Sequence, residues 1–361
     1  MKINNEKFRT IWPNKSKNLN TITVSIIDQT KLPHAFEIVE INSLQQMVLA
    51  IKTMQVRGAP LIGAAAAYGM ALAMQHDCSD DYIQQAVQQL IQSRPTAVNL
   101  KWAVERLKRL LLTLNDESRL EAAWLEASHI CNEDVVLNQA IGQHGLNLIK
   151  SLYAKHPRRL NILTHCNAGW LATVDFGTAL APIYAAHEAG LDLHVWVDET
   201  RPRNQGASLT AWELAQHGVP HTVICDNAGG HLMQQGQVDM VIVGADRVTS
   251  TGDVCNKIGT YLKALAAFDN QVPFYAAVPS PTIDWTIQDG VQEIEIEERD
   301  GRELTWMLGT LATGERAEVN ILPPNTKVAN PAFDVTPARL VTGIITEHGV
   351  YTPNQLNKMP K

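Results

Sequence analysis

Apolar and polar positions follow different patterns in the two parts of the chain. Near the N-terminus, threonine and serine alternate with apolar residues from Asn20 to Ile27, the period-two pattern of a half-buried strand. Leu32 to Ile41 also has strand character and can pair with it. From Ser43 the pattern becomes helical. The sequence therefore predicts a short β segment followed by helices.

The predicted helices differ in how much of their surface is apolar. Pro60 to Gln75 is dominated by Ala, Leu, Met and Gly, which predicts a helix buried on all sides. Asp80 to Gln92 and Leu100 to Leu114 are amphipathic, and the turn-forming residues Ser93 to Thr96 separate them. A long helical region follows from about Ser118 to Tyr153.

Chain length indicates two domains, because 361 residues exceed the roughly 250 to 300 at which a single hydrophobic core stops growing. No Pro-, Gly- or Ser-rich linker marks the boundary, so we place it inside the long helical region. The expected domains are a mainly helical one with a small β segment, residues 1–128, and a larger one, residues 129–361.

Beyond Arg159, short apolar runs rich in β-branched residues alternate with helical segments. Near-continuous apolar strands separated by helices predict a mostly parallel sheet that is covered on both faces. The carboxyl ends of its strands then share one edge, where open α/β sheets bind their ligands. The predicted strands are Leu160–His165, Leu191–Val197, His221–Cys225, Met240–Val243 and Pro273–Val278.

Composition and charge exclude several classes of protein. Hydrophobic residues make up 45% of the chain and charged residues 19%, which is too apolar for a disordered protein. Thirty Lys and Arg against 37 Asp and Glu give a net charge of −7, so a nucleic-acid partner is not expected. No run of about 18 apolar residues predicts a membrane span.

Cysteine usage and the N-terminal segment indicate a reducing compartment. The five cysteines are scattered and form no CxxC pair, which argues against a disulfide framework and a structural zinc site. The first thirty residues lack the apolar centre of a signal peptide. We therefore expect a cytoplasmic protein.

Polar and glycine residues follow four of the predicted strands. Any one of these groups is explained by ordinary turn chemistry, but four at one sheet edge favour a functional site. GxxxxGK[ST], HExxH and GxSxG motifs are absent, so their chemistries have no support. The groups are Cys166 to Gly169, Asp198 to Gly206, Asp226 to Gly229, and Gly244 to Arg247.

Cys166 and Asp246 are the candidate reactive groups. A lone cysteine at a strand end is usually an inert buried side chain, but Cys166 precedes Asn167 to Gly169, whose amide groups could stabilise charge. Asp246 has the alternatives of a helix cap or a partner for Arg247. Burial at a strand exit would raise its pKa and make it a proton donor near neutral pH.

Three segments are candidates for binding an anion. Arg57, Gly58 and Ala59 precede Pro60, a favoured first residue of a helix, so a guanidinium and free backbone amides meet at a helix N-terminus. Arg94 lies in the turn at residues 93–96, and Asn256 and Lys257 are expected to open the helix that ends near Phe268. For each cation the alternative is a solvated surface charge.

Two further features are interpreted as structural. His165 could serve as a base for Cys166, but adjacent strand residues point to opposite faces, which favours a packing role. The glutamates at 293, 295, 297 and 298 alternate like the residues of a strand, and we expect a solvated edge there.

Seven ordered blocks carry a pattern more specific than any single motif. They are RGAPLIGAAAAYG (57–69), SRPTAVNL (93–100), LTHCNAG (163–169), VDETRPRNQGASLTAWEL (197–214), VIVGADR (241–247), GDVCNKIGTYLKALAA (252–267) and NPAFDVTPARLVTGIITEHGV (330–350). Together they resemble the methylthioribose-1-phosphate isomerases over nearly the whole chain. Ribose-1,5-bisphosphate isomerases and regulatory subunits of a translation-initiation exchange factor share that superfamily.

The resemblance implies a cytoplasmic enzyme of methionine salvage that converts 5-methylthioribose 1-phosphate to 5-methylthioribulose 1-phosphate. It also implies a homodimer of two-domain subunits, the larger domain Rossmann-like, with no metal and no nucleotide cofactor. Cys166 and Asp246 would be the catalytic pair. The substrate contacts that it implies are Arg57, Gly58, Ala59, Arg94, Gln205, Asn256 and Lys257.

Departures from the family are small, and two other functions remain as alternatives. Ser208 stands where the family commonly has a basic residue, and Cys255 where a small apolar residue is usual. A regulatory, binding-only subunit is one alternative. Another is an isomerase for a different 1-phosphorylated pentose, such as ribose 1,5-bisphosphate, although the sequence shows no second cationic cluster for a second phosphate.

Overall fold

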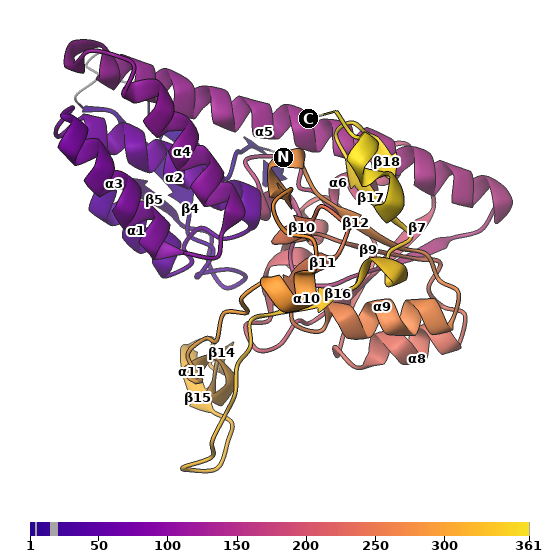
Figure 1. Cartoon of the computed structure of the whole chain (residues 1–361). Coiled ribbons are helices and arrows are strands. Elements are labelled where there is room, and N and C mark those ends of the chain that lie inside the picture. Colours follow the sequence, from indigo (N-terminus) through magenta and orange to yellow (C-terminus); the bar gives the residue numbers. More distant parts are fainter. Residues whose placement is uncertain (4–5, 15–20, 361) are drawn as a thin grey trace.

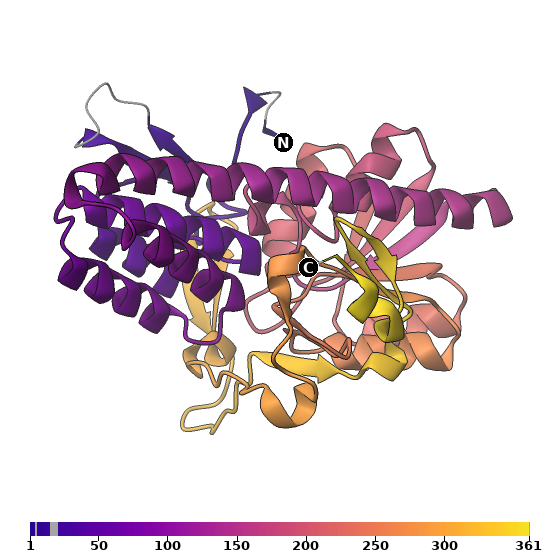
Figure 2. The same ribbon diagram turned by 45° about the horizontal axis from the view of Figure 1, so that its top comes forward.

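The computed structural model describes residues 1–3, 6–14 and 21–360. A helical region from the first third of the chain lies beside an α/β region, and one long helix runs along both of them (Figures 1 and 2). This arrangement is the predicted α/β class, a mainly helical N-terminal part with a small β segment followed by a larger part built on a mostly parallel sheet.

A small antiparallel sheet precedes the helices, as predicted. Strand β4 (Thr23–Ile27) pairs with β5 (Ile38–Ile41), which confirms the expected pairing. Strand β3 (Ile11–Asn14), which the sequence pattern did not predict, extends the sheet on the other side of β4. Two two-residue strands, β1 (Lys2–Ile3) and β2 (Glu6–Lys7), also pair with each other. Asn20, at the start of the predicted strand, lies outside the described residues.

Four helices follow, close to the predicted ranges. Ser43 caps the first by accepting a hydrogen bond from the Gln46 amide, and Ser79 caps the third in the same way from Tyr82. The second is buried along nearly its whole length, as its composition predicts. They are α1 (Leu44–Lys52), α2 (Ala59–Met74), α3 (Asp80–Ser93) and α4 (Val98–Leu111).

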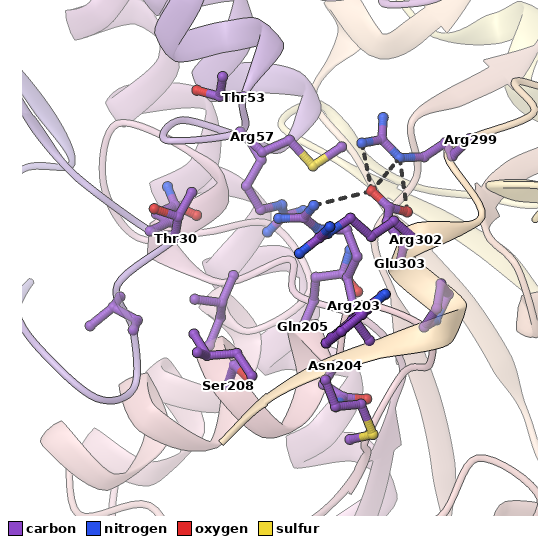
Figure 3. Close-up of a pocket in the computed structure, with 18 of the residues that line it drawn as sticks. Thr30, Thr53, Arg57, Arg203, Asn204, Gln205, Ser208, Arg299, Arg302 and Glu303 are labelled. Carbon is purple, nitrogen blue, oxygen red and sulfur yellow. Dashed lines mark hydrogen bonds and ion pairs between the residues drawn. The ribbon is translucent and has the colours of Figure 1, made fainter. Parts of the chain in front are cut away.

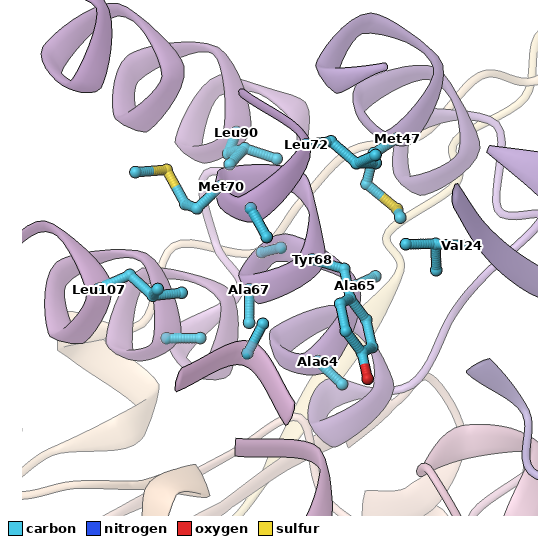
Figure 4. Packing of buried hydrophobic residues seen from close by; sticks show 14 of the residues in the cluster. Val24, Met47, Ala64, Ala65, Ala67, Tyr68, Met70, Leu72, Leu90 and Leu107 are labelled. Carbon is cyan, nitrogen blue, oxygen red and sulfur yellow. The ribbon is translucent and has the colours of Figure 1, made fainter. Parts of the chain in front are cut away.

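Helix α2 forms the centre of the N-terminal core (Figure 4). Its alanines let neighbouring helices approach closely, and larger side chains such as Tyr68 and Met70 fill the remaining space. Met47, Leu90 and Leu107 come from α1, α3 and α4 and pack around it. Truncating one of these large side chains to alanine costs about 2–5 kcal/mol in such a core, so α2 is held firmly among its neighbours.

The long helical region is one helix, α5 (Asp116–Lys155), of 40 residues and about 60 Å. Its first half, including Trp124 and Ile130, packs in the N-terminal core. Its second half, including Ile141 and Ile149, packs in the core of the α/β part. The division between residues 128 and 129 falls inside this continuous helix and stays a prediction.

A seven-stranded sheet forms the centre of the α/β part, in the order β18-β17-β12-β9-β6-β7-β8. All five predicted strands are present and pair in parallel, and only the edge strand β18 is antiparallel. The sequence pattern did not predict β17 and β18. The strands are β6 (Leu160–Thr164), β7 (Leu193–Asp198), β8 (His221–Ile224), β9 (Met240–Val243), β12 (Phe274–Ala277), β17 (Gly343–Thr346) and β18 (Gly349–Tyr351).

Helices cover both faces of the sheet, as its apolar strands predict. Ile162 and Ile242 share a core with α5, whereas the alternate residues Leu163 and Val241 share another with α8 and α9. Among the described residues, no helix combines the length and apolar character that crossing a membrane requires. Among the other helices of this part are α6 (Ala181–Glu188), α7 (Ala211–Gln216), α8 (Ala228–Gln234) and α9 (Thr260–Asp269), and a π-helical turn at Gly206–Thr210 precedes α7.

A second, four-stranded sheet lies beyond the carboxyl end of β9 and corrects one prediction. Asn256 and Lys257 lie on its strand β11 (Val254–Lys257), and α9 begins only at Thr260. Because β11 pairs with strands on both sides, these residues are fixed by a ladder and not by a helix start. The other strands of this sheet are β10 (Arg247–Thr249), β13 (Ile283–Asp284) and β16 (Phe333–Thr336).

The segment between β13 and β16 includes a hairpin that projects from the body (Figure 1). Strand β14 (Trp306–Thr310) pairs with β15 (Arg316–Asn320), and the short helices α10 (Gly290–Glu293) and α11 (Arg302–Thr305) precede them. The strand expected around Glu293 to Glu298 is wrong, since α10 ends at Glu293 and Glu298 forms only an isolated bridge.

Candidate active site

The two candidate reactive residues leave neighbouring strands at the point where the strand order reverses. Cys166 follows β6 and Asp246 follows β9, and β6 and β9 pair directly. From β6 the chain builds the sheet in one direction through β7 and β8, and then returns to add β9 and β12 on the other side. This reversal is the position at which open parallel sheets form a ligand crevice.

Cys166 has a strained backbone that two threonines hold in place. Its φ of 64° lies in the left-handed region, which costs a non-glycine residue about 1–3 kcal/mol. The Cys166 amide donates to Oγ1 of Thr200 at 2.8 Å, and its carbonyl accepts from Oγ1 of Thr210 at 2.7 Å. The conformation therefore depends on the loop that follows β7.

The Cys166 thiol is buried among charged groups. Burial raises its pKa above the ordinary value, and the carboxylate of Asp246 acts in the same direction. The positive charges of Arg57 and Lys257 act against this rise. Burial therefore favours the thiol, and the two cations favour the thiolate.

Burial also raises the pKa of Asp246, as expected for a carboxyl at a strand exit. The cations Arg94, Lys257 and Arg57 oppose the rise. The Asp246 amide donates to the carbonyl of Cys255 at 2.9 Å, which ties the residue to β11. These interactions place Asp246 in the same electrostatic environment as Cys166.

Arg57, Gly58 and Ala59 lie at the N-terminus of α2, as predicted. Gly58 has a φ of 93°, and a Cβ at this position would lie 2.6 Å from Ala172, so only glycine fits. The Arg57 guanidinium donates to Oδ1 of Asn167 at 2.6 Å and to the Asn167 carbonyl at 2.9 Å. The helix start is thereby joined to the segment that follows Cys166.

Arg94 is no solvated surface charge. Its side chain is only 10% exposed and lies 3.7 Å from Oε2 of Glu297. Burial lowers the pKa of Arg94, and the charges of Glu297 and Asp246 act against that change. Because Glu297 faces Arg94, it does not belong to a solvated edge, in contrast to the exposed Glu295. Ala59, Arg94 and Asp246 line one small cavity.

The remaining predicted contacts are buried as well. The Lys257 ammonium lies 4.9 Å from the centre of the Phe333 ring, and burial lowers its pKa while Cys166 and Asp246 act to raise it. Gln205 precedes the π-helical turn, and its Oε1 is buried with no hydrogen-bond partner. The Asn256 side chain donates to Oγ1 of Thr260 at 3.0 Å.

A cavity of about 500 Å³ opens beside Arg57 and Gln205 (Figure 3). Ser208, the departure from the family pattern, also lines it. The sequence reasoning missed its further cations, so the expected absence of a second cationic cluster is wrong. The three further arginines each have a carboxylate partner, since Arg203 and Arg299 pair with Glu303 and Arg302 pairs with Glu318; Lys52 also lines the cavity.

His165 has the packing role that the strand alternation favours. Its Nδ1 lies 2.8 Å from Oδ2 of Asp198, and its Nε2 lies 2.8 Å from the carbonyl of Ile258. His165, Asp198 and Asp226 are close enough to resemble a metal-ligand cluster. The ammonium of Lys263, 3.2 Å from Asp198, supplies the positive charge there. Both Asp226 oxygens accept backbone amides of the loop at residues 200–201.

The sequence reasoning also missed the residues that hold the site from behind. Thr200, Thr210 and Glu213 are fully buried and bond to Cys166 or Asn167. All three lie in the block at residues 197–214, so the family pattern carried the only signal for them. Hydrophobic periodicity gives no indication of such contacts, because they depend on how β6 and α7 meet.

The chain is similar to known proteins over nearly its whole length. Residues 55–353 match the Initiation factor 2 subunit family. The curated methylthioribose-1-phosphate isomerase of Rhodospirillum rubrum is 61% identical over 356 residues, which are 97% of this chain and 90% of that protein.

Two solved structures are also similar over nearly the whole chain. The 5-methylthioribose 1-phosphate isomerase of Pyrococcus horikoshii is 38% identical with a TM-score of 0.80, covering 98% of this chain and 96% of that one. A structure titled as translation initiation factor eIF-2B, subunit delta, from A. fulgidus is 40% identical with a TM-score of 0.77, covering 97% and 98%.

The fold and the match over residues 55–353 define an α/β protein of the Initiation factor 2 subunit family. Within that class, the chain belongs to the methylthioribose-1-phosphate isomerase family. The family resemblance of the seven sequence blocks is thereby confirmed, and the protein is an isomerase.

Proposed function

We propose that this enzyme converts 5-methylthioribose 1-phosphate to 5-methylthioribulose 1-phosphate in methionine salvage, with Cys166 and Asp246 as its catalytic residues. The observation that carries the assignment of residues is the meeting of a buried thiol and a buried carboxyl with Arg57, Arg94 and Lys257. A sugar phosphate requires such cations, and an isomerisation requires two groups that handle protons.

The chemistry explains why two groups are needed. Phosphate on the anomeric oxygen prevents the sugar from opening spontaneously to an aldehyde. The enzyme must therefore assist cleavage of the bond between C1 and the ring oxygen, and must move hydrogen from C2 to C1. In our proposal Asp246 protonates the ring oxygen as that bond breaks, and then takes part in proton exchange on the C2 oxygen. C1 is reduced and C2 oxidised, so no external oxidant is needed.

Cys166 has two possible roles. In one, its thiolate removes the proton from C2, and the thiol returns it to C1 through an enediol-type intermediate. In the other, hydride passes directly from C2 to C1, and Cys166 stabilises the charge that develops. Arg57 and Lys257 favour a thiolate in the first role, and burial of the site strengthens charge interactions in both.

Replacing Arg57 or Lys257 with alanine is expected to raise the Michaelis constant about tenfold or more, with a smaller effect on kcat. The reason is that contacts to the phosphate persist from the bound substrate through the reaction. Steady-state kinetics on methylthioribose 1-phosphate measures both constants. An unchanged Michaelis constant in both variants would mean that the phosphate binds elsewhere.

The lining of the 500 Å³ cavity is mostly polar, but it includes a few apolar side chains that could contact a thioether. Met54, Leu209 and Met307 line it beside Arg57, while the arginines Arg203, Arg299 and Arg302 are engaged by Glu303 and Glu318. We therefore expect faster turnover of methylthioribose 1-phosphate than of 5-deoxyribose 1-phosphate or ribose 1,5-bisphosphate. Rates of the purified enzyme on the three sugars test this order, and a preference for the bisphosphate would reassign the substrate.

A regulatory subunit is the second candidate function, because a similar structure is titled as an initiation-factor subunit. The presence of both reactive groups and the full set of predicted substrate contacts favours the enzyme. Turnover of methylthioribose 1-phosphate by the purified protein alone separates the two functions, since a binding-only subunit has none.

We also propose that the protein is a homodimer and that it is located in the cytoplasm. The support for both is the family resemblance, together with the five free cysteines, which suit a reducing compartment. Light scattering on the purified protein tests the dimer: a mass of about twice 39.8 kDa is expected.

A further inference from the structure

We infer that Glu213 is a positioning residue of the phosphate site, and that it acts through Asn167 on Arg57. The inference rests on the proposed function, because it takes Arg57 as a phosphate contact. Glu213 lies on α7, on the side of Asn167 away from Arg57, and is fully buried. None of the predicted substrate contacts includes it.

The Glu213 carboxylate serves two donors that follow Cys166 in the chain. Its Oε1 accepts a short hydrogen bond from Nδ2 of Asn167, and its Oε2 accepts from the amide of Trp170 at 2.8 Å. Between these donors, Gly169 leaves room for the carboxylate: a Cβ there would lie 2.1 Å from Oε1. The segment from Asn167 to Trp170 is thus wrapped around one carboxylate.

This arrangement fixes which way the Asn167 amide points. Oγ1 of Thr210 lies 3.2 Å from Nδ2 of Asn167, on the same side as Glu213. A carboxylate only accepts hydrogen bonds, so the Asn167 oxygen is directed to the opposite side. There Oδ1 accepts from Nη1 of Arg57, while the Asn167 carbonyl accepts from Nη2. Both acceptors of the Arg57 guanidinium therefore belong to one residue that Glu213 orients.

A carboxylate is needed here, and an amide of the same shape does not replace it. Glutamine has one accepting oxygen and one NH₂ group, so it would accept from either Asn167 or Trp170 and oppose a donor at the other. Burial raises the pKa of Glu213 to about 7, while interactions with the side chains of Asn167 and Tyr184 and with the amides of Trp170 and Leu171 act to lower it. The free-energy cost of burying the Glu213 carboxyl is offset because both of its oxygens accept hydrogen bonds.

The competing explanation is a purely structural role, in which Glu213 stabilises the segment after Cys166 without any specific effect on Arg57. The two explanations differ in their coupling to Arg57. When two residues act through one series of hydrogen bonds, the effects of their substitutions on substrate binding are not additive. A general loss of stability instead adds to the effect of removing Arg57.

The test is a double-mutant cycle with Glu213→Gln and Arg57→Ala. Glu213→Gln alone is expected to raise the Michaelis constant for methylthioribose 1-phosphate about tenfold, the effect of one lost charge-assisted contact, with less than about a threefold change in kcat. In the Arg57→Ala background, the same substitution is expected to add almost nothing. Additive effects, or an unchanged Michaelis constant in the single variant, would overturn the inference.

Asp134→Asn is the matched control. Asp134 is another buried carboxyl whose pKa burial raises to about 7, and it also accepts a backbone amide, that of Val174 at 2.7 Å. It makes no hydrogen bond to Asn167 or Arg57, so whatever effect Asp134→Asn has is expected to add to that of Arg57→Ala. If Glu213→Gln does not fold, Asn167→Ala replaces it in the cycle, with the same expected non-additivity.

Binding of inorganic phosphate separates this inference from the proposed function. Calorimetric titration of the same variants measures the dissociation constant without turnover. We expect Glu213→Gln to bind phosphate more weakly than the wild type, and to cause no further weakening when it is added to Arg57→Ala. This result supports the inference even if the wild-type protein does not isomerise methylthioribose 1-phosphate. Phosphate that does not bind to the wild type, or that binds equally to both single variants and the wild type, overturns it.

Discussion

Asp246→Asn is expected to lower kcat at least about a hundredfold, the lower range for positioned acid and base groups, while the Michaelis constant changes little. The substitution keeps the shape of the side chain and removes its titratable proton. Because the Asp246 amide is held by the Cys255 carbonyl, the backbone should stay in place. Steady-state kinetics on a variant with unaltered thermal unfolding measures the effect, and near-normal turnover would remove Asp246 from the mechanism.

The pH dependence of kcat provides a second test of Asp246. A proton donor acts in its protonated form, so kcat should fall as pH rises through the pKa of Asp246. Burial raises that pKa above its ordinary value of 3.8, which moves the fall toward neutral pH. The Asp246→Asn variant should lack this limb. Asp289→Asn is a suitable control, because Asp289 is an exposed cap of α10 and should leave the profile unchanged.

The strands and the buried helix could be predicted from the sequence because their patterns are local. Met240–Val243 is apolar throughout, and a strand of that kind has few alternatives to the middle of a parallel sheet. Asn256 and Lys257 show the limit of this reasoning. The sequence pattern placed them at the start of the helix that ends near Phe268, whereas they belong to β11. This strand is only four residues long, and its position depends on pairing with strands that are distant in sequence.

The candidate site could be predicted in part, for a related reason. Residues at strand ends follow from the fold, so Cys166 and Asp246 could be placed at one edge before any geometry was known. The sequence could not show which of the charged residues around them are paired with an opposite charge. Arg94 and Arg299 are both largely buried near Glu297, yet only the first lies in a recognised motif. Whether a cation is paired or free is a property of tertiary contacts.

Deuterium transfer tests how hydrogen moves between the carbons. If Cys166 relays the proton as a base, the C2 hydrogen spends time on sulfur and exchanges with solvent unless the closed site is dry. A direct hydride shift never exposes it. In deuterated water, substantial deuterium at C1 of the ketose would therefore indicate the thiol relay. Its absence leaves a hydride shift or a shielded proton transfer, so a test of the thiol itself is needed.

Cys166→Ser provides that test and is expected to lower kcat about a thousandfold, within the range for positioned proton-transfer groups. The serine hydroxyl is smaller and far less acidic than the thiol, and both mechanisms require the thiol for chemistry. Substrate binding should persist, because Arg57 and Lys257 are unchanged. Cys225→Ser is the matched control, since that cysteine is exposed and free.

The contacts that hold the Cys166 backbone make the effect of Cys166→Ser specific to the side chain. Thr200 and Thr210 hold its amide and carbonyl and not its sulfur, so the serine variant should keep the φ of 64° and the position of the loop. A loss of turnover with intact phosphate binding then reports on the thiol alone. A fully active Cys166→Ser enzyme would instead return Cys166 to the alternative of an inert buried cysteine at a strand end.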